Sequence, residues 1–281
     1  MNKIFIKISA LSISLSLMIL AASCTKTGAT GPNGAAGSNG APGPTLTGNI
    51  QGLVSLYDVS GVKILSPTDS LSGDSVILTN VGSGAVMKTV TGSNGMYTFT
   101  NVSTGTYSMV VNRQGYGRVL VYGSQFVGGG TIDKNFALSK IPTTNILAAV
   151  AKDTTFAVVG AGNVPEKYIR VRGSVPVSGA VTTVIIYVSQ AAATFVDSIP
   201  PNFSTYYTTT VSPGVSKFNF YIPTNNFYDL GFPSGGISHA YFAAYILAGN
   251  TNASTYTDWS TQQTVFTALS STPIYVNAPV Q

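Results

Sequence analysis

Hydrophobic and polar residues alternate with a period of two through the middle of the chain. Tyr97 and Phe99 share one face of a predicted strand, and Tyr107, Met109 and Val111 share one face of the next. Alternation of this kind is typical of strands with one buried side. Only a short run of turn residues separates the two strands, so we expect them to pair with each other as a hairpin or a meander.

The same pattern continues towards the end of the chain. It predicts further strands at residues 145–151, 167–175, 181–189, 217–223 and 239–248. Residues 181–189 and 239–248 are nearly continuous apolar runs, which predicts central strands covered on both faces. No long stretch with a helical period interrupts these strands. The predicted fold class is therefore all-β, with two β-sandwich domains.

The first residues have the pattern of an export signal. Lys3 and Lys7 precede a short apolar stretch that ends near Leu20, and small residues follow it. Serines interrupt the stretch, and it is too short to cross about 30 Å of hydrocarbon comfortably. We therefore expect an export signal rather than a membrane span.

The only cysteine of the chain follows this stretch. Ala21, Ala22 and Ser23 lead into Cys24, which resembles the lipobox of bacterial lipoproteins. The resemblance implies that residues 1–23 are a lipoprotein signal peptide and that Cys24 is lipidated. Leucine is more usual where Ala21 stands. The alternative is an ordinary secreted protein with a spare thiol, although no second cysteine exists to pair with it.

Glycine recurs at every third position from Gly28 to Gly43. The pattern is collagen-like, because only glycine fits at the axis of a triple helix. The run is short and poor in proline, so residues 24–44 are interpreted as the lipidated cysteine followed by a flexible Gly-X-Y tether. A trimeric stalk is the alternative.

Charge is sparse along the chain. It carries 14 basic and 9 acidic residues, and charged residues make up only 8% of it. Along the sequence no cluster of Lys and Arg appears, and Arg170 and Arg172 are the closest pair. Nucleic-acid binding normally needs a basic patch or stripe, so we expect no nucleic-acid partner.

A set of turn, glycine and aromatic residues is spaced along residues 45–140. They are Thr91, Asn94, Gly95, Tyr97, Phe99, Gly105, Tyr107, Val111, Gly115 and Tyr116, with residues 48–54 and 71–80 upstream. Through them, residues 45–140 resemble the carboxypeptidase regulatory-like domain, a transthyretin-like β-sandwich. Gly92 departs from the family, which often has aspartate there. The resemblance implies a non-catalytic domain, whose wider fold group includes carbohydrate-binding modules.

The second domain is expected at residues 141–281, after a short linker that begins with Ile141 and Pro142. Its strands and short turns predict a second β-sandwich. It is loosely similar to immunoglobulin-like modules, but no motif names its family.

Residues for catalysis are few. The chain has one histidine, His239, and one glutamate, Glu166, and it has no serine nucleophile motif. We therefore expect no enzyme, no metal and no cofactor, with a hydrolase as a remote alternative. Asp69 and Asp74 could contribute to a calcium site, but a polar turn is the simpler interpretation.

The only tryptophan, Trp259, lies in a polar stretch with Tyr256 and Asp258. Aromatic rings beside hydrogen-bonding groups are typical of sugar sites, so these three residues are the candidate ligand-binding site. The alternative is that Trp259 covers the end of the second sandwich.

A three-residue motif recurs at four places in the chain. Its first residue is Asp, its second is Ser or Thr, and its third is an apolar residue or Thr. The pattern resembles the O-glycosylation motif of exported proteins in Bacteroidetes-type bacteria. The candidate glycosylated residues are Ser70, Ser75, Thr154 and Ser198.

Together these patterns predict an outer-membrane lipoprotein, held through Cys24 and facing the periplasm or the cell surface. Its predicted function is a non-catalytic binding module, with polysaccharide as the more specific ligand. The alternative is a structural or assembly subunit whose partner is another envelope protein.

Overall fold

Contacts divide the chain into two compact units, Met1–Pro44 and Thr45–Gln281. Cys24 and Ser198 lie outside the described residues, and the domain boundaries predicted from the sequence stay predictions. The computed structural model describes residues 31, 34, 46–65, 70–157, 165–189, 203–229, 238–249 and 251–280, without the side chains of 153–157, 165–166, 228–229, 238 and 280.

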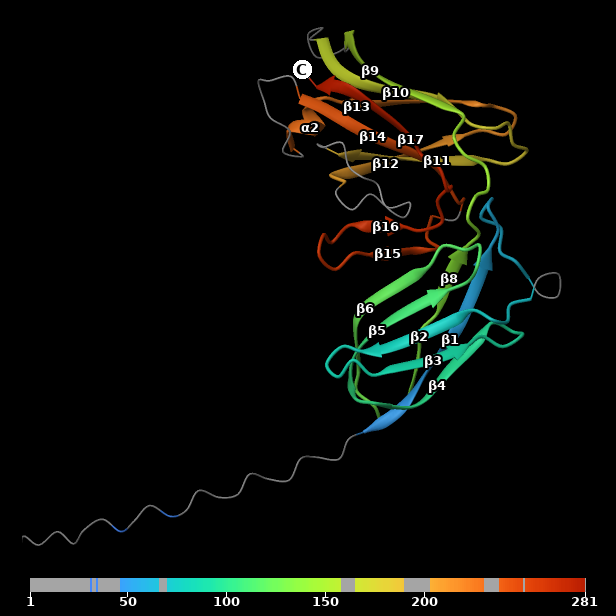
Figure 1. Cartoon of the computed structure of the whole chain (residues 1–281), viewed down its shortest axis with the longest axis vertical. Coiled ribbons are helices and arrows are strands. Elements are labelled where there is room, and N and C mark those ends of the chain that lie inside the picture. Colours follow the sequence, from blue (N-terminus) through green and yellow to red (C-terminus); the bar gives the residue numbers. More distant parts are fainter. Residues whose placement is uncertain are drawn as a thin grey trace, which may run out of the picture. The chain divides into compact units, whose positions relative to one another are not determined.

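The protein is built almost entirely of strands, as the alternation predicts (Figure 1). The predicted all-β fold class is confirmed. One short helix, α2 (Asn225–Asp229), lies among the described residues, and no helix there is long and apolar enough to cross a membrane.

Strands β1 to β8 form a first sandwich, with its core between two sheets. One sheet has the order β4-β1-β7, and β8 continues along the edge of β1 that β7 begins; the other has the order β3-β2-β5-β6. The strands are β1 (Thr47–Tyr57), β2 (Ser75–Asn80), β3 (Val86–Val90), β4 (Met96–Ser103), β5 (Gly105–Asn112), β6 (Val119–Phe126), β7 (Thr131–Asp133) and β8 (Phe136–Ser139).

The predicted pairing of β4 with β5 is wrong. β4 pairs with β1, whereas β5 pairs with β2 and β6 in the opposite sheet. The turn between them carries the chain across the core, and the hydroxyl of Tyr107 donates to the carbonyl of Ser103 at 2.9 Å. Tyr97 and Tyr107 are nevertheless both buried, as predicted. The alternation therefore predicts which face of a strand is buried, but not which other strand it pairs with.

A second sandwich packs one three-stranded sheet against one of four strands. The orders are β13-β10-β9 and β12-β11-β14-β17, and their shared core includes Ile169, Val171, Phe218 and Phe242. The strands are β9 (Ala148–Ala157), β10 (Pro165–Ser174), β11 (Thr182–Ser189), β12 (Thr205–Val211), β13 (Lys217–Pro223), β14 (Ser238–Leu247) and β17 (Ile274–Val280).

β11 and β14 are covered on both faces, which confirms the prediction from their apolar runs. Val184 and Ile186 face the shared core. Ile185 and Tyr187 face a further cluster on the opposite side, where Phe266 packs. Phe266 belongs to a separate two-stranded hairpin, β15 (Thr255–Thr257) and β16 (Thr264–Phe266).

A buried ion pair secures the loop before β2. Arg113 donates to Oδ1 of Asp74 at 2.8 Å, and Asp74 is fully buried. The same guanidinium donates to the carbonyl of Ser70 at 2.9 Å. Asp74 thus pairs through Oδ1 with a cation of the protein itself, and Asp69 lies outside the described residues.

Substitution of Arg113 by Met should lower the free energy of unfolding by about 3 kcal/mol, because it leaves the Asp74 carboxylate buried without its charge partner. Chemical denaturation of the variant measures this change. Lys88→Met, at an exposed position of the edge strand β3, is the control and should change it by less than about 0.5 kcal/mol. Equal effects of the two substitutions would contradict the structural role of the pair.

Candidate functional site

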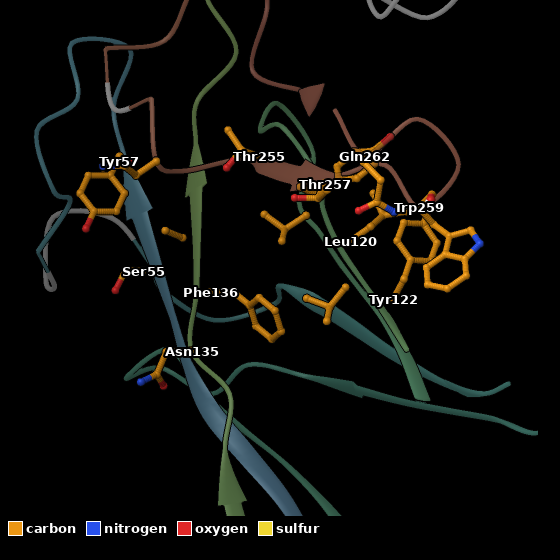
Figure 2. Close-up of a pocket in the computed structure, with 15 residues that line it drawn as sticks. Ser55, Tyr57, Leu120, Tyr122, Asn135, Phe136, Thr255, Thr257, Trp259 and Gln262 are labelled. Carbon is orange, nitrogen blue, oxygen red and sulfur yellow. Dashed lines mark hydrogen bonds between the residues drawn. The ribbon is translucent and has the colours of Figure 1, made fainter. Parts of the chain in front are cut away.

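A hollow lies where the hairpin β15–β16 meets β6 and β8 of the first sandwich. Its volume is about 700 Å³. Five aromatic side chains line it, with Tyr57 at one end and Trp259 at the other (Figure 2). Between them the lining combines apolar side chains of β6 and β8 with hydroxyl and amide groups from Ser55, Asn135, Asn252, Thr255, Thr257 and Gln262.

Trp259 is presented to solvent by the loop of the hairpin. Its side chain is 73% exposed, and its carbonyl accepts a hydrogen bond from Nε2 of Gln262 at 2.7 Å. Gln262 has a φ of 56°, so it takes the left-handed conformation that reverses the chain. The indole is therefore a free stacking surface on an ordered loop, and it does not cover the core of the second sandwich.

Asp258 shapes this loop and does not line the hollow. Its Oδ1 accepts hydrogen bonds from the hydroxyl of Ser260 at 2.6 Å and from the backbone N–H groups of Ser260 and Thr261, both at 2.9 Å. The hydroxyl of Ser260 and the N–H of Thr261 hold the pKa of Asp258 below its ordinary value. Among the three predicted ligand-binding residues, Asp258 therefore positions the loop that carries Trp259.

Tyr256 joins the hairpin to the first sandwich. Its ring meets that of Tyr122 on β6 edge to face, with ring centroids 6.3 Å apart. It is half-buried, and burial raises the pKa of its hydroxyl. Tyr122, Tyr57 and Phe136 complete the aromatic lining, and sequence reasoning missed all three. Tyr122 is 42% exposed on a strand, and an exposed aromatic there gives no signal until β15 is known to lie beside β6.

The hairpin is fixed to the first sandwich through Ser254. Its hydroxyl donates to the carbonyl of Gly117 at 2.7 Å and accepts from the N–H of Ser139 at 2.7 Å. Gly117 is needed here, because a Cβ at this position would lie 2.5 Å from the nitrogen of Ala268 and 2.6 Å from Cβ of Ser254. Ser254 is buried with a φ of 52°, which is uncommon for a residue other than glycine.

The opposite side of the hairpin is held by packing. Phe266 of β16 meets Tyr206 edge to face at 5.0 Å, and both pack against the outer side of β11 and β14. The hairpin is thus anchored by hydrogen bonds on one side and by aromatic contacts on the other. Tyr206 serves this packing.

The lining of the hollow is uncharged. No Asp, Glu, Lys, Arg or His is among the described residues that line it. Aromatic faces and neutral hydrogen-bonding groups suit a ligand that has apolar faces and hydroxyl groups together.

The other residues singled out from the sequence lie elsewhere. Ser70 is exposed in the loop before β2, and Ser75 is partly exposed within β2. Thr154 of β9 lies opposite Tyr168 of β10, and the structure does not describe its side chain. His239 is exposed near the start of β14. Within the described part of the chain, no three His, Cys, Asp or Glu residues come together as a metal site.

Comparison with known proteins gives one family match. Residues 61–139 match the carboxypeptidase regulatory-like domain, which agrees with the resemblance seen in the sequence. The match covers β2 to β8, and two of these strands, β6 and β8, supply part of the lining of the hollow. No curated protein matches the chain.

Solved structures resemble the chain only remotely. A proposed carbohydrate-binding protein from Bacteroides uniformis is 13% identical, with 82% of this chain and 98% of that one covered and a TM-score of 0.26. A DUF3823 family protein from Parabacteroides merdae is 13% identical, with 85% and 100% covered and a TM-score of 0.25. The major pilin SpaD from Corynebacterium diphtheriae is 8% identical, with 83% and 65% covered and a TM-score of 0.26. Likeness at this level supports no inference about function.

The Trp259 loop should loosen in acid. The pKa of Asp258 is lowered from 3.8, so its stabilising effect is complete above that pH and is lost as the pH falls through the lower, folded value. Trp259 is the only tryptophan, so its fluorescence reports on the loop. We expect an emission change below pH 3.8 that Asp258→Asn removes and Asp133→Asn retains. A transition identical in all three proteins would contradict this role.

Proposed function

We propose that the aromatic hollow binds a neutral oligosaccharide and that the protein is a non-catalytic binding module. The observation that carries this proposal is the pairing of an exposed, held indole with an uncharged lining of hydroxyl and amide groups. Sugar rings present an apolar face to an aromatic ring and hydroxyl groups at the rim, so both kinds of lining are used.

The dimensions of the hollow support a short chain of sugars. Ligand sites are commonly about 300–1,000 Å³, and the hollow falls within that range at about 700 Å³. Tyr57 and Trp259 at its two ends offer stacking surfaces to different rings of one chain. The lining itself carries no charge, which favours hydroxyl-bearing sugars over acidic ones. The nearby cation, Arg118, is engaged with the side chain of Tyr256.

We further propose that the chain is a lipoprotein of the outer membrane. The support is the export signal and the small residues that lead into Cys24. A lipid anchor there, followed by the Gly-X-Y tether, would hold the sugar-binding unit away from the bilayer.

Trp259→Ala should weaken oligosaccharide binding by about five- to thirtyfold, because stacking on one aromatic ring contributes on the order of 1–2 kcal/mol. Isothermal titration of the full-length protein in detergent against a panel of neutral oligosaccharides measures it. Val127→Ala removes a side chain of equal exposure, 74%, away from the hollow and should leave the affinity unchanged. Absence of binding by the unaltered protein across the panel would overturn the proposal and favour an assembly subunit.

Cys24→Ala should abolish lipidation, because no other thiol exists in the chain. Metabolic labelling with a palmitate analogue in a Gram-negative host, followed by membrane fractionation, measures the loss. Incorporation of label that survives the substitution would contradict the anchor, and it would leave the proposed sugar binding untouched.

A further inference from the structure

Basic side chains gather on one face of the sheet β13-β10-β9. Arg170 on β10 lies directly opposite Lys152 on β9. Lys217 on β13 lies opposite Ser174 on β10, two residues after Arg172. Directly opposite residues, and alternate residues along a strand, share a face. The four cations therefore lie on the same face. The residues between them are buried against the core of the second sandwich, so the basic face is the outer one.

The four cations form a diagonal across the three strands. Lys152 lies on β9, Arg170 and Arg172 on β10, and Lys217 on β13. With strands about 4.8 Å apart and alternate residues about 6.7 Å apart, the diagonal spans roughly 16 Å. Lys152, Arg172 and Lys217 are exposed. The sequence shows no such cluster, because the register of the sheet creates it.

These charges are not neutralised by the described residues around them. No described side chain on β9, β10 or β13 is acidic, and none of the four cations forms an ion pair with a described residue. The side chains of Asp153 and Glu166 lie outside the description. Arg170 is the most ordered of the four, since its Nε donates to Oδ1 of Asn219 at 2.7 Å and its guanidinium lies 5.6 Å from the ring centre of Tyr221.

A hollow of about 510 Å³ follows the same face. Arg170, Arg172, Lys217 and Asn219 line it together with the small side chains of Ala148 and Ser174. The small residues leave room along the sheet, while the long basic ones border that room. Three of the four cations therefore border one hollow on the outer face of the sheet.

We propose that this face binds an acidic polysaccharide, whose carboxylate groups pair with the cations along the diagonal. The guanidinium groups offer several N–H donors each for this pairing, and Asn219 lies among them to bind hydroxyl groups. A single-stranded nucleic acid would need free stacking platforms, whereas Tyr168 and Tyr221 on this face meet each other edge to face. The basic face shares no residue with the aromatic hollow, so each proposed site can be tested independently of the other.

The test compares polygalacturonate with its methyl ester, which keeps the sugar backbone and removes the charge. The full-length protein in detergent should bind polygalacturonate, with an affinity that falls as salt is added, and should bind the ester at least tenfold more weakly. The triple variant Lys152→Gln, Arg172→Gln, Lys217→Gln should lose about tenfold or more in affinity for polygalacturonate. It keeps Arg170, which packs on its neighbours, so the sheet should stay intact.

A control of equal charge is Lys63→Gln, Lys88→Gln, Lys140→Gln, at exposed positions of the first sandwich. It should lose less than about twofold in affinity, because these lysines lie off the basic face. Three results would overturn the proposal: no binding of polygalacturonate at low salt, equal losses in the two triple variants, or a single-stranded polynucleotide bound more tightly than polygalacturonate through the same residues. Trp259→Ala should leave this binding unchanged, which separates it from the neutral site.

Discussion

The hydroxyl of Ser254 is the contact on which the rest of the site depends. It joins the carbonyl of Gly117 to the N–H of Ser139, two backbone groups that would otherwise be buried without these partners. Ser254 directly precedes β15, so this contact fixes where the hairpin begins. The N–H of Ser254 donates to the carbonyl of Ala137 at 2.8 Å, and the hydroxyl of Thr267 donates to the carbonyl of Arg118. Together these contacts position the wall that carries Tyr256 and Trp259 against β6 and so set the width of the hollow.

The two proposed sites use the same β-architecture in different ways. The aromatic hollow needs a loop and a hairpin held at a distance from a sheet, and its lining is neutral. The basic face needs only the register of three paired strands, which aligns charges separated by up to 65 residues between Lys152 and Lys217. One chain can thereby present a stacking surface for neutral sugars and a charged surface for acidic ones.

Much of the fold could be predicted from the alternation of residues, and the reason is physical. Phe218 and Ile222 are buried and Asn219 is exposed, because a strand with one wet face must alternate. The partner of each strand could not be predicted, since β4 and β5 both bury their apolar face yet belong to opposite sheets. β15 and β16 are three residues each, too short for any period to be read.

The site was only partly predictable for the same reason. Trp259 and Tyr256 stood out by composition, but Tyr122 and Tyr57 join them only through tertiary contacts. Asp258 was placed in the right segment with a different role, because its carboxylate is engaged by Ser260 and Thr261. The basic face gave no sequence signal, since Lys152 and Arg170 become neighbours only across two paired strands.

The most direct test of this account is a double-mutant cycle between Ser254→Ala and Trp259→Ala, read as affinity for a neutral oligosaccharide. Ser254 does not line the hollow. The account nevertheless predicts that Ser254→Ala weakens binding when Trp259 is present. It also predicts a smaller loss from Ser254→Ala when Trp259 is already replaced, because part of the effect of Ser254 is to position that ring. Full affinity in Ser254→Ala, or losses that simply add, would contradict the claim that this hydroxyl holds the binding wall in place.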